Sequence, residues 1–159
     1  MKLSKLGKAK LKKIIVRRAD RIAARRGGAG SMAMDSAIGM PEVVFKFEGP
    51  TTLTSEVRPQ RGFKLTRATF DVTLNAVAIA AGVTVAVDSI QAGMFNCLSS
   101  NASMPMVSFR YDAIGARINA PKISKGTEVI TQFRLLGGPM PADGQAVVTG
   151  SYWGEADKD

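Results

Sequence analysis

The sequence predicts an all-β body, an eight- to nine-stranded antiparallel sandwich of jelly-roll type, with a basic N-terminal arm. Three observations predict this fold class. After Pro41 the apolar residues recur with a period of two, turn residues interrupt them about every eight to twelve residues, and helical periodicity is missing from this region. The strand number and the mixed loop lengths favour a jelly roll over an immunoglobulin-type sandwich. The sequence also lacks the Cys–Trp–Cys pattern of immunoglobulin domains.

The arm, residues 1–26, carries the charge of the protein. It holds eleven lysines and arginines against one acid, Asp20, a net charge of +10, whereas the whole chain has +9 and residues 27–159 therefore have −1. A segment this basic is typical of proteins that bind an anionic partner. We expect its cations to bind nucleic acid, and the candidates are Lys5, Lys8, Lys10, Lys12, Lys13, Arg17, Arg18, Arg21, Arg25 and Arg26.

Two conformations of the arm are compatible with its sequence. From Leu11 to Arg26 the residues are good helix formers, and Leu11, Ile15 and Ile22 fall on one narrow stripe. Positive charge surrounds this stripe, so we expect a helix only on a partner and a disordered arm otherwise. Glycines in residues 27–41 predict a flexible linker that Pro41 closes.

The predicted body spans residues 42–153 and begins with three strands. In the first, Val43, Phe45 and Phe47 share the core face, and Gly49-Pro50 forms the turn that ends it. The threonine-rich stretch 51–57 is the second. The third, 64–74, has the clearest alternation, with a core face made of Ala68, Phe70, Val72 and Leu74.

The strand after Gly82 contains an irregularity. Val83, Val85 and Val87 share one face, but Ile90 has the opposite parity, which predicts a bulge or bend near Asp88-Ser89. Further strands are expected in 93–98, 107–111, 114–118, 127–136 and 145–153, and residues 154–159 read as an acidic tail. Phe109 and Phe133 are expected in the core with Phe45, Phe47 and Phe70.

The sequence offers little for catalysis, so we expect no enzyme, no cofactor and no metal site. Histidine, the commonest general base and metal ligand, does not occur. The single cysteine, Cys97, lies in an apolar run and is expected to be buried and inert. No apolar run approaches the roughly 18 residues of a membrane-spanning helix.

A second basic cluster lies in the body, in the stretch RPQRGFKLTR, and consists of Arg58, Arg61, Lys64 and Arg67. It allows two functional interpretations, a further phosphate contact or an arginine fork for the carboxylates of a neighbouring subunit. The simpler interpretation is a solvated turn that Glu56 and Asp71 balance and Phe63 anchors. Exposed stacking aromatics are not evident, so we expect nucleic-acid binding to be independent of base sequence and sensitive to salt.

This layout of basic arm, glycine hinge and near-neutral β-body resembles the single jelly-roll coat proteins of small icosahedral viruses and bacteriophages. The resemblance covers the whole chain in organisation and involves no diagnostic motif. It implies a capsid protein whose bodies tile an icosahedral shell as a homo-oligomer while the arms bind the packaged genome. The expected location is then the virion, assembled in the host cytoplasm, with copies of itself and other virion proteins as partners.

Two alternatives fit the arm. The residues Leu11, Ile14, Ile15 and Ile22 among cations also suit a virion or peripheral protein whose arm lies on an anionic membrane surface. A cellular, sequence-independent nucleic-acid-binding module is the other alternative, although it leaves the neutral body without a role.

Overall fold

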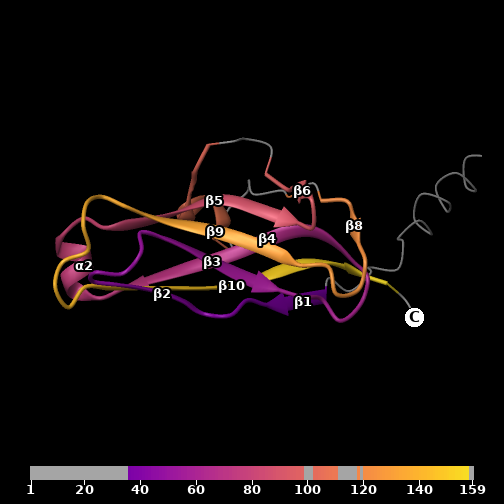
Figure 1. Ribbon diagram of the computed structural model, residues 1–159, viewed down its shortest axis with the longest axis horizontal. Coiled ribbons are helices and arrows are strands. Elements are labelled where there is room, and N and C mark those ends of the chain that lie inside the picture. Colours follow the sequence, from indigo (N-terminus) through magenta and orange to yellow (C-terminus); the bar gives the residue numbers. More distant parts are fainter. Residues whose placement is uncertain (1–35, 99–101, 111–117, 119, 158–159) are drawn as a thin grey trace, which may run out of the picture. The chain divides into compact units, whose positions relative to one another are not determined.

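A computed structural model describes residues 36–98, 102–110, 118 and 120–157 of the chain. These residues belong to one compact unit, Asp35–Asp159, which we call the body. Its described part contains ten strands, one short α-helix and one 3-10 helix (Figure 1). The arm, most of the linker and residues 114–117 of a predicted edge strand lie outside the described residues.

The body is a sandwich of two five-stranded antiparallel sheets, which confirms the predicted fold class at this level. In the first sheet the order is β1-β10-β4-β8, and β2 pairs with the other half of the long strand β10. The strands are β1 (Ser36–Gly39), β2 (Val43–Lys46), β4 (Phe63–Leu74), β8 (Lys122–Ile123) and β10 (Gln145–Ala156).

The second sheet has the order β3-β9-β5-β6, and β7 also pairs with β5. Its strands are β3 (Thr52–Val57), β5 (Thr84–Ala92), β6 (Phe95–Asn96), β7 (Met104–Pro105) and β9 (Val129–Leu136). The chain therefore changes sheet six times, between β2 and β3, β3 and β4, β4 and β5, β7 and β8, β8 and β9, and β9 and β10.

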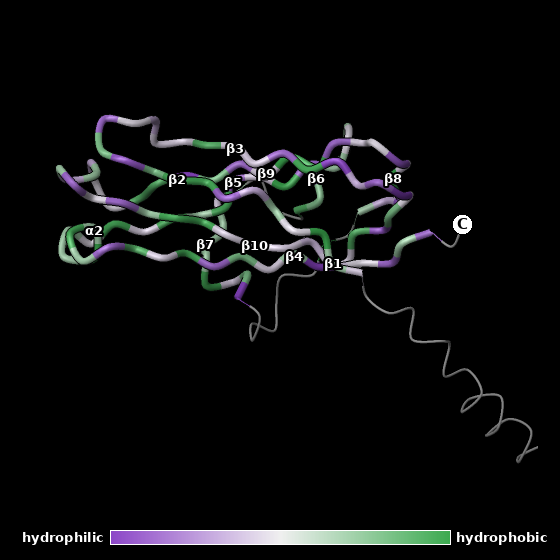
Figure 2. Tube along the Cα trace, turned by 90° about the horizontal axis from the view of Figure 1, so that it is seen from below, coloured by the Kyte–Doolittle hydropathy of each residue, from purple (hydrophilic) through white to green (hydrophobic). Residues whose placement is uncertain are grey.

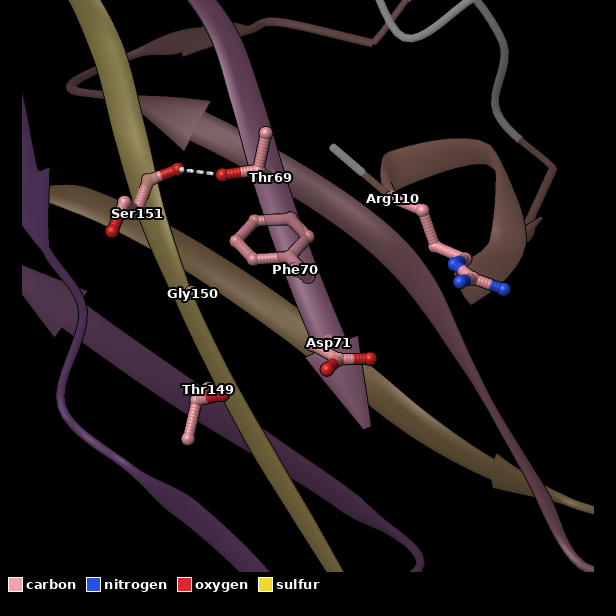
Figure 3. A pocket seen from close by; sticks show the side chains of 7 residues that line it. All are labelled: Thr69, Phe70, Asp71, Arg110, Thr149, Gly150 and Ser151. Atoms are coloured by element: carbon pink, nitrogen blue, oxygen red, sulfur yellow. Dashed lines mark hydrogen bonds between the residues drawn. The ribbon is translucent and has the colours of Figure 1, made fainter. Parts of the chain in front are cut away.

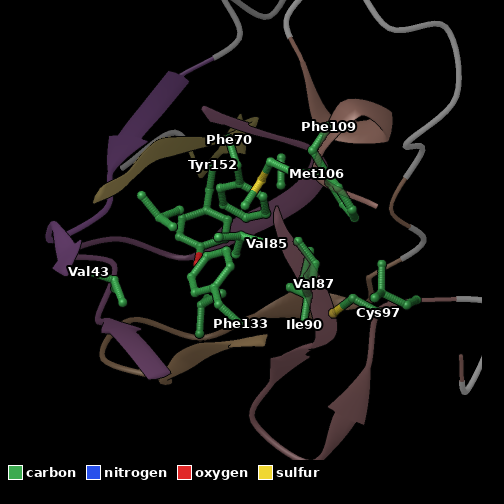
Figure 4. Close-up of a cluster of buried hydrophobic side chains, with 14 of the residues drawn as sticks. Val43, Phe70, Val85, Val87, Ile90, Cys97, Met106, Phe109, Phe133 and Tyr152 are labelled. Carbon is green, nitrogen blue, oxygen red and sulfur yellow. The ribbon is translucent and has the colours of Figure 1, made fainter. Parts of the chain in front are cut away.

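The core lies between the sheets and centres on Phe70 of β4 (Figure 4). The Phe70 ring centroid lies 5.3 Å from those of Phe109 and Phe133 and 5.8 Å from that of Tyr152. The contacts with Phe133 and Tyr152 are edge-to-face, the arrangement that the aromatic quadrupole favours. One side chain from the first sheet thus contacts rings of both sheets.

In β4 the alternation in the sequence identified the inward residues correctly. Ala68 and Phe70 are buried, and Val72 and Leu74 pack against the core from partly buried positions. The predicted bulge is confirmed, because the register of β5 against β9 shifts between Val87 and Ser89 and thereby returns Ile90 to the core. Figure 2 shows the resulting mixture of hydrophobic and hydrophilic positions along the strands.

Several local predictions were wrong. Residues 36–39, expected in the linker, form β1, and the last strand continues through residues 154–156, expected in the tail. Residues 76–80 form the helix α2 (Ala76–Ala80), although no helical period was found there. Residues 106–109 form the 3-10 helix η1 (Met106–Phe109) instead of a strand.

Phe47 is the one phenylalanine expected in the core that is exposed. Its side chain is 49% exposed because β2 ends at Lys46 and the chain turns there. The Gly49 amide donates to the Lys46 carbonyl oxygen, and Glu48 has a positive φ of 58°. The turn interrupts the alternation before Phe47 reaches the inner face.

Candidate functional site

The nucleic-acid-binding residues predicted in the arm, from Lys5 to Arg26, lie outside the described residues. The structure does describe the second basic cluster of the body, Arg58, Arg61, Lys64 and Arg67. It also describes two surface hollows, a set of buried hydroxyl groups and a buried carboxylate.

A hollow of about 300 Å³ lies where β3 and β10 end and where β1 and β4 begin. Arg58 and Arg61 line it from the loop that follows β3, and Ile38, Pro59 and Phe63 contribute apolar wall. Phe63 is 2% exposed, so it anchors this loop to the core as expected. The hollow combines an apolar wall with two guanidinium groups.

Arg58 already has two carboxylate partners. Its Nη2 lies 2.8 Å from Glu56 Oε1 and also contacts Glu128 Oε1, while its Nε donates to Glu56 over 2.9 Å. The hydrogen bond to Glu56 and the charge of Glu128 raise the pKa of Arg58 above its ordinary value. The partnership with Glu56 belongs to the simpler sequence interpretation. Glu128 lies 70 residues away along the chain, so sequence reasoning did not find it.

The other two cations of the cluster lie along β4. Lys64 is exposed and stands in register with Lys122 of β8 on one side and Glu155 of β10 on the other. Lys122 Nζ lies 2.6 Å from Asp157 Oδ1. Arg67 is partly buried and stands opposite Trp153. Arg58 and Arg61 thus line the hollow together, whereas Lys64 and Arg67 are not part of its lining.

A second hollow, of about 390 Å³, lies over β4 and β10 (Figure 3). It was not predicted. Thr69, Thr149 and Ser151 supply hydroxyl groups, and Asp71 and Arg110 supply opposite charges. The Thr69 hydroxyl donates to the Ser151 carbonyl oxygen over 3.4 Å and accepts from Trp153 Nε1 over 2.8 Å. The Thr69 hydroxyl group is therefore already hydrogen-bonded to two residues of β10.

Three hydroxyl groups face the core. Thr131 Oγ1 and Tyr152 Oη lie 2.5 Å apart and link the two sheets, and Thr131 is fully buried. Burial raises the pKa of Tyr152 to about 12. Ser55 lies opposite Thr131 in the β3–β9 pair, and its buried Oγ has no hydrogen-bond partner in the described part of the body.

Two further polar groups lie near β5. Asp88, the residue at the bulge, accepts from Ser103 Oγ over 2.5 Å and from Arg134 Nε over 2.8 Å. Its side chain is only 9% exposed, so these partners compensate a carboxylate largely removed from water. Cys97 is buried as predicted, and desolvation raises the pKa of its thiol.

Among the described residues, no group of three or more His, Cys, Asp or Glu side chains is placed to hold a metal ion. No helix in that part of the chain is long and apolar enough to cross a membrane. Comparisons of the sequence with protein-family models and curated proteins, and of the fold with solved structures, found no match.

Proposed function

We propose that this chain is a structural virion protein whose body tiles an icosahedral shell and whose basic arm binds the packaged nucleic acid without sequence specificity. The observation that carries the proposal is the separation of charge. Residues 1–26 have a net charge of +10, and the remaining 133 residues have −1. A shell subunit needs this separation because the genome requires many cations, whereas like-charged bodies would repel one another at their contacts.

The strand pairing supports a jelly roll within this proposal. Three pairs are nested along the chain, β2 with β10, β3 with β9 and β4 with β8. This is the pairing of one long hairpin. Folding the hairpin over adds the pairs β4 with β10 and β5 with β9, which produces two facing sheets of four main strands. Double-sheet jelly rolls of eight strands have this arrangement.

The ion pairs of the body are consistent with an arm that carries the nucleic-acid binding. Arg58, Lys122 and Arg134 each contact a carboxylate of the body. A phosphate would have to displace these carboxylates to bind there. We therefore assign Arg58 of the second basic cluster to the body's own ion pairs, and the genome to the arm.

Light scattering on the purified full-length protein tests the proposal, with the absorbance ratio at 260 and 280 nm measured on the same peak. We expect a particle of megadalton mass that contains nucleic acid. Residues 27–159 alone should keep the β-sheet circular dichroism spectrum and lose nucleic-acid uptake. Nucleic-acid binding by the full chain should weaken with salt, by up to about 0.9 decades in affinity per decade of salt for each DNA phosphate contacted.

Three results would contradict this proposal. A small oligomer without nucleic acid, whose arm binds anionic vesicles, would favour a membrane-surface protein. A monomer that binds nucleic acid and forms no particle would favour a cellular binding module. A strong preference for one oligonucleotide at fixed salt would contradict the sequence-independent polycation.

A further inference from the structure

One end of the body exposes apolar side chains. The connections β2–β3, β4–β5 and β9–β10 lie together at the end that carries α2 (Figure 1). There Phe47 is 49% exposed, Val77 39%, Ile79 61% and Leu136 40%. We call these four residues the apolar end. Isolated exposed apolar residues are ordinary, but a gathered set of large ones marks an interaction site.

The helix α2 contributes two of these four residues, Val77 and Ile79. From Asn75 to Val83 the chain has no charged residue, and Ala78 is the only buried residue of the helix. Val77 and Ile79 therefore point away from the body, on faces where a solvated helix normally carries polar side chains. Figure 2 shows α2 as a hydrophobic segment at this end of the body. Packing inside the subunit does not account for these residues.

The apolar end is held in a defined geometry. Asn75 Oδ1 accepts from the amides of Ala78 and Gln145, and its Nδ2 donates to the Asp143 carbonyl oxygen over 2.6 Å. This side chain thus caps α2 and ties it to the β9–β10 connection. A binding surface that is ordered beforehand loses less conformational entropy when a partner binds.

Charged residues lie in the same connections around the apolar centre. Lys46 and Glu48 flank Phe47, and Asp143 precedes the start of β10; all three are exposed. An apolar centre with a charged rim is the usual anatomy of a protein–protein interface. Because the rim holds charges of both signs, two copies can place Lys46 of one opposite Glu48 or Asp143 of the other. An anionic membrane would instead repel both carboxylates.

We propose that the apolar end is a self-association surface, at which copies of this chain meet around a rotation axis through Ile79 and its apolar neighbours. This inference rests on the proposed shell function and names the contact that the function requires. Hydrophobic burial supplies the attraction, and the rim charges select a copy over a membrane surface.

The substitution Ile79→Lys tests this surface in the full-length chain, and Val107→Lys is a matched control. Ile79 and Val107 are both 61% exposed, both β-branched and both in short helices, but Val107 lies in η1 and not in the apolar end. Lysine is a better helix former than isoleucine, so we expect both variants to fold. Ile79→Ala removes apolar area without adding charge.

The readout is particle mass by sedimentation velocity over a range of protein concentrations, with circular dichroism to check folding. We expect Ile79→Lys to weaken self-association at least about tenfold, the effect of losing a central interface residue. Val107→Lys should associate like the wild type, and Ile79→Ala should be intermediate. Wild-type-like assembly of folded Ile79→Lys would overturn the inference, as would an equal loss in Val107→Lys or a wild type that remains monomeric.

Two further measurements separate this inference from the proposed function. If Ile79→Lys impairs association but the full chain binds no nucleic acid, the contact stands and the shell function fails. If Ile79→Lys still forms particles that contain nucleic acid, the function stands and the contact is wrong. If the wild type binds phosphatidylserine vesicles through Ile79 without a change in oligomer mass, the surface serves a membrane and the inference is rejected.

Discussion

Removing the Tyr152 hydroxyl should destabilise the body by stranding a buried polar atom. Thr131 Oγ1 lies 2.5 Å from Tyr152 Oη, and Thr131 has no exposed surface. Tyr152→Phe removes one hydrogen bond and leaves Thr131 Oγ1 desolvated without this partner. A hydrogen bond contributes a net free energy of about 1 kcal/mol to stability, and a buried polar group left without a partner costs about 1–3 kcal/mol. We therefore expect the free energy of unfolding to fall by about 1–3 kcal/mol.

A double-mutant cycle makes this expectation specific. Thr131→Val should cost a similar amount, because it strands the Tyr152 hydroxyl instead. The double variant Tyr152→Phe/Thr131→Val removes both polar groups and should be less destabilised than the sum of the single variants. Ser55→Ala is the control, since the Ser55 hydroxyl is buried without a partner in the described body and its loss should be neutral or stabilising.

Urea denaturation followed by circular dichroism measures these differences as shifts of the midpoint at constant slope. Additive costs in the cycle would refute the reasoning, because two independent sites cannot be a hydrogen-bonded pair. A loss for Ser55→Ala as large as that for Tyr152→Phe would also refute it, because the polar partner would then not be the cause.

The same tyrosine makes a pH prediction. The pKa of Tyr152 is raised from 10.0 to about 12, mainly by burial. The folded state therefore holds this proton more tightly than the unfolded state, and the associated stability is complete below about pH 10. It should be lost as the pH rises from about 10 to 12, with a limiting slope of about 1.4 kcal/mol per pH unit. Tyr152→Phe should lack this component, so wild type and variant should converge over that interval.

Two other predictions concern backbone packing and the ordering of α2, and both use the same denaturation assay. Gly150→Ala should destabilise the body by about 1–3 kcal/mol or more, since a Cβ there would contact Phe70 and lie 2.6 Å from the Thr69 carbonyl oxygen. Gly39→Ala should have little effect, because nothing lies within 4 Å of its Cβ position. Asn75→Ala should cost about 1–2 kcal/mol through loss of the helix cap, and an unchanged midpoint would show that this side chain does not hold the apolar end in place.

The sequence predicted the long strands because alternation reports the inward face directly. The parity break at Ile90 even located the register shift of β5, since an extra residue in a strand moves every following side chain to the opposite face. This reasoning depends on runs of several residues. It worked for β4, β5 and β9, which have 12, 9 and 8 residues.

Short elements were missed for the same reason. The helix α2 has five residues, fewer than two turns, so a period of 3.6 cannot develop. Val107 and Phe109 have the spacing of a strand, but the buried residues of η1 are Met106 and Phe109, three apart, which is the period of a 3-10 helix. β1 has only four residues, and its pairing with β10 joins positions more than 100 residues apart.

The candidate sites depended even more on distant residues. The sequence identified the cations Arg58 and Arg61, but not Glu128, which precedes β9 and pairs with Arg58. The four residues of the apolar end come from the β2–β3 connection, from α2 and from the last position of β9, and each alone is an ordinary exposed side chain. Only the topology, which returns these segments to one end of the sandwich, brings them together.

The separation of charge and the apolar end impose opposite requirements on the same molecule. In the proposed assembly each copy brings a net charge of +9, the sum of +10 from the arm and −1 from the rest of the chain, while the proposed contacts through the apolar end gain only short-range burial energy. At an ionic strength of about 0.01 M charges interact over about 30 Å, but at 0.15 M over about 8 Å. Without a polyanion, self-association of the full chain should therefore strengthen with salt, whereas residues 27–159 should associate equally well at both. Under the proposed shell function, nucleic acid should provide the same relief by neutralising the arms, and assembly of the full chain should then depend on the presence of a genome.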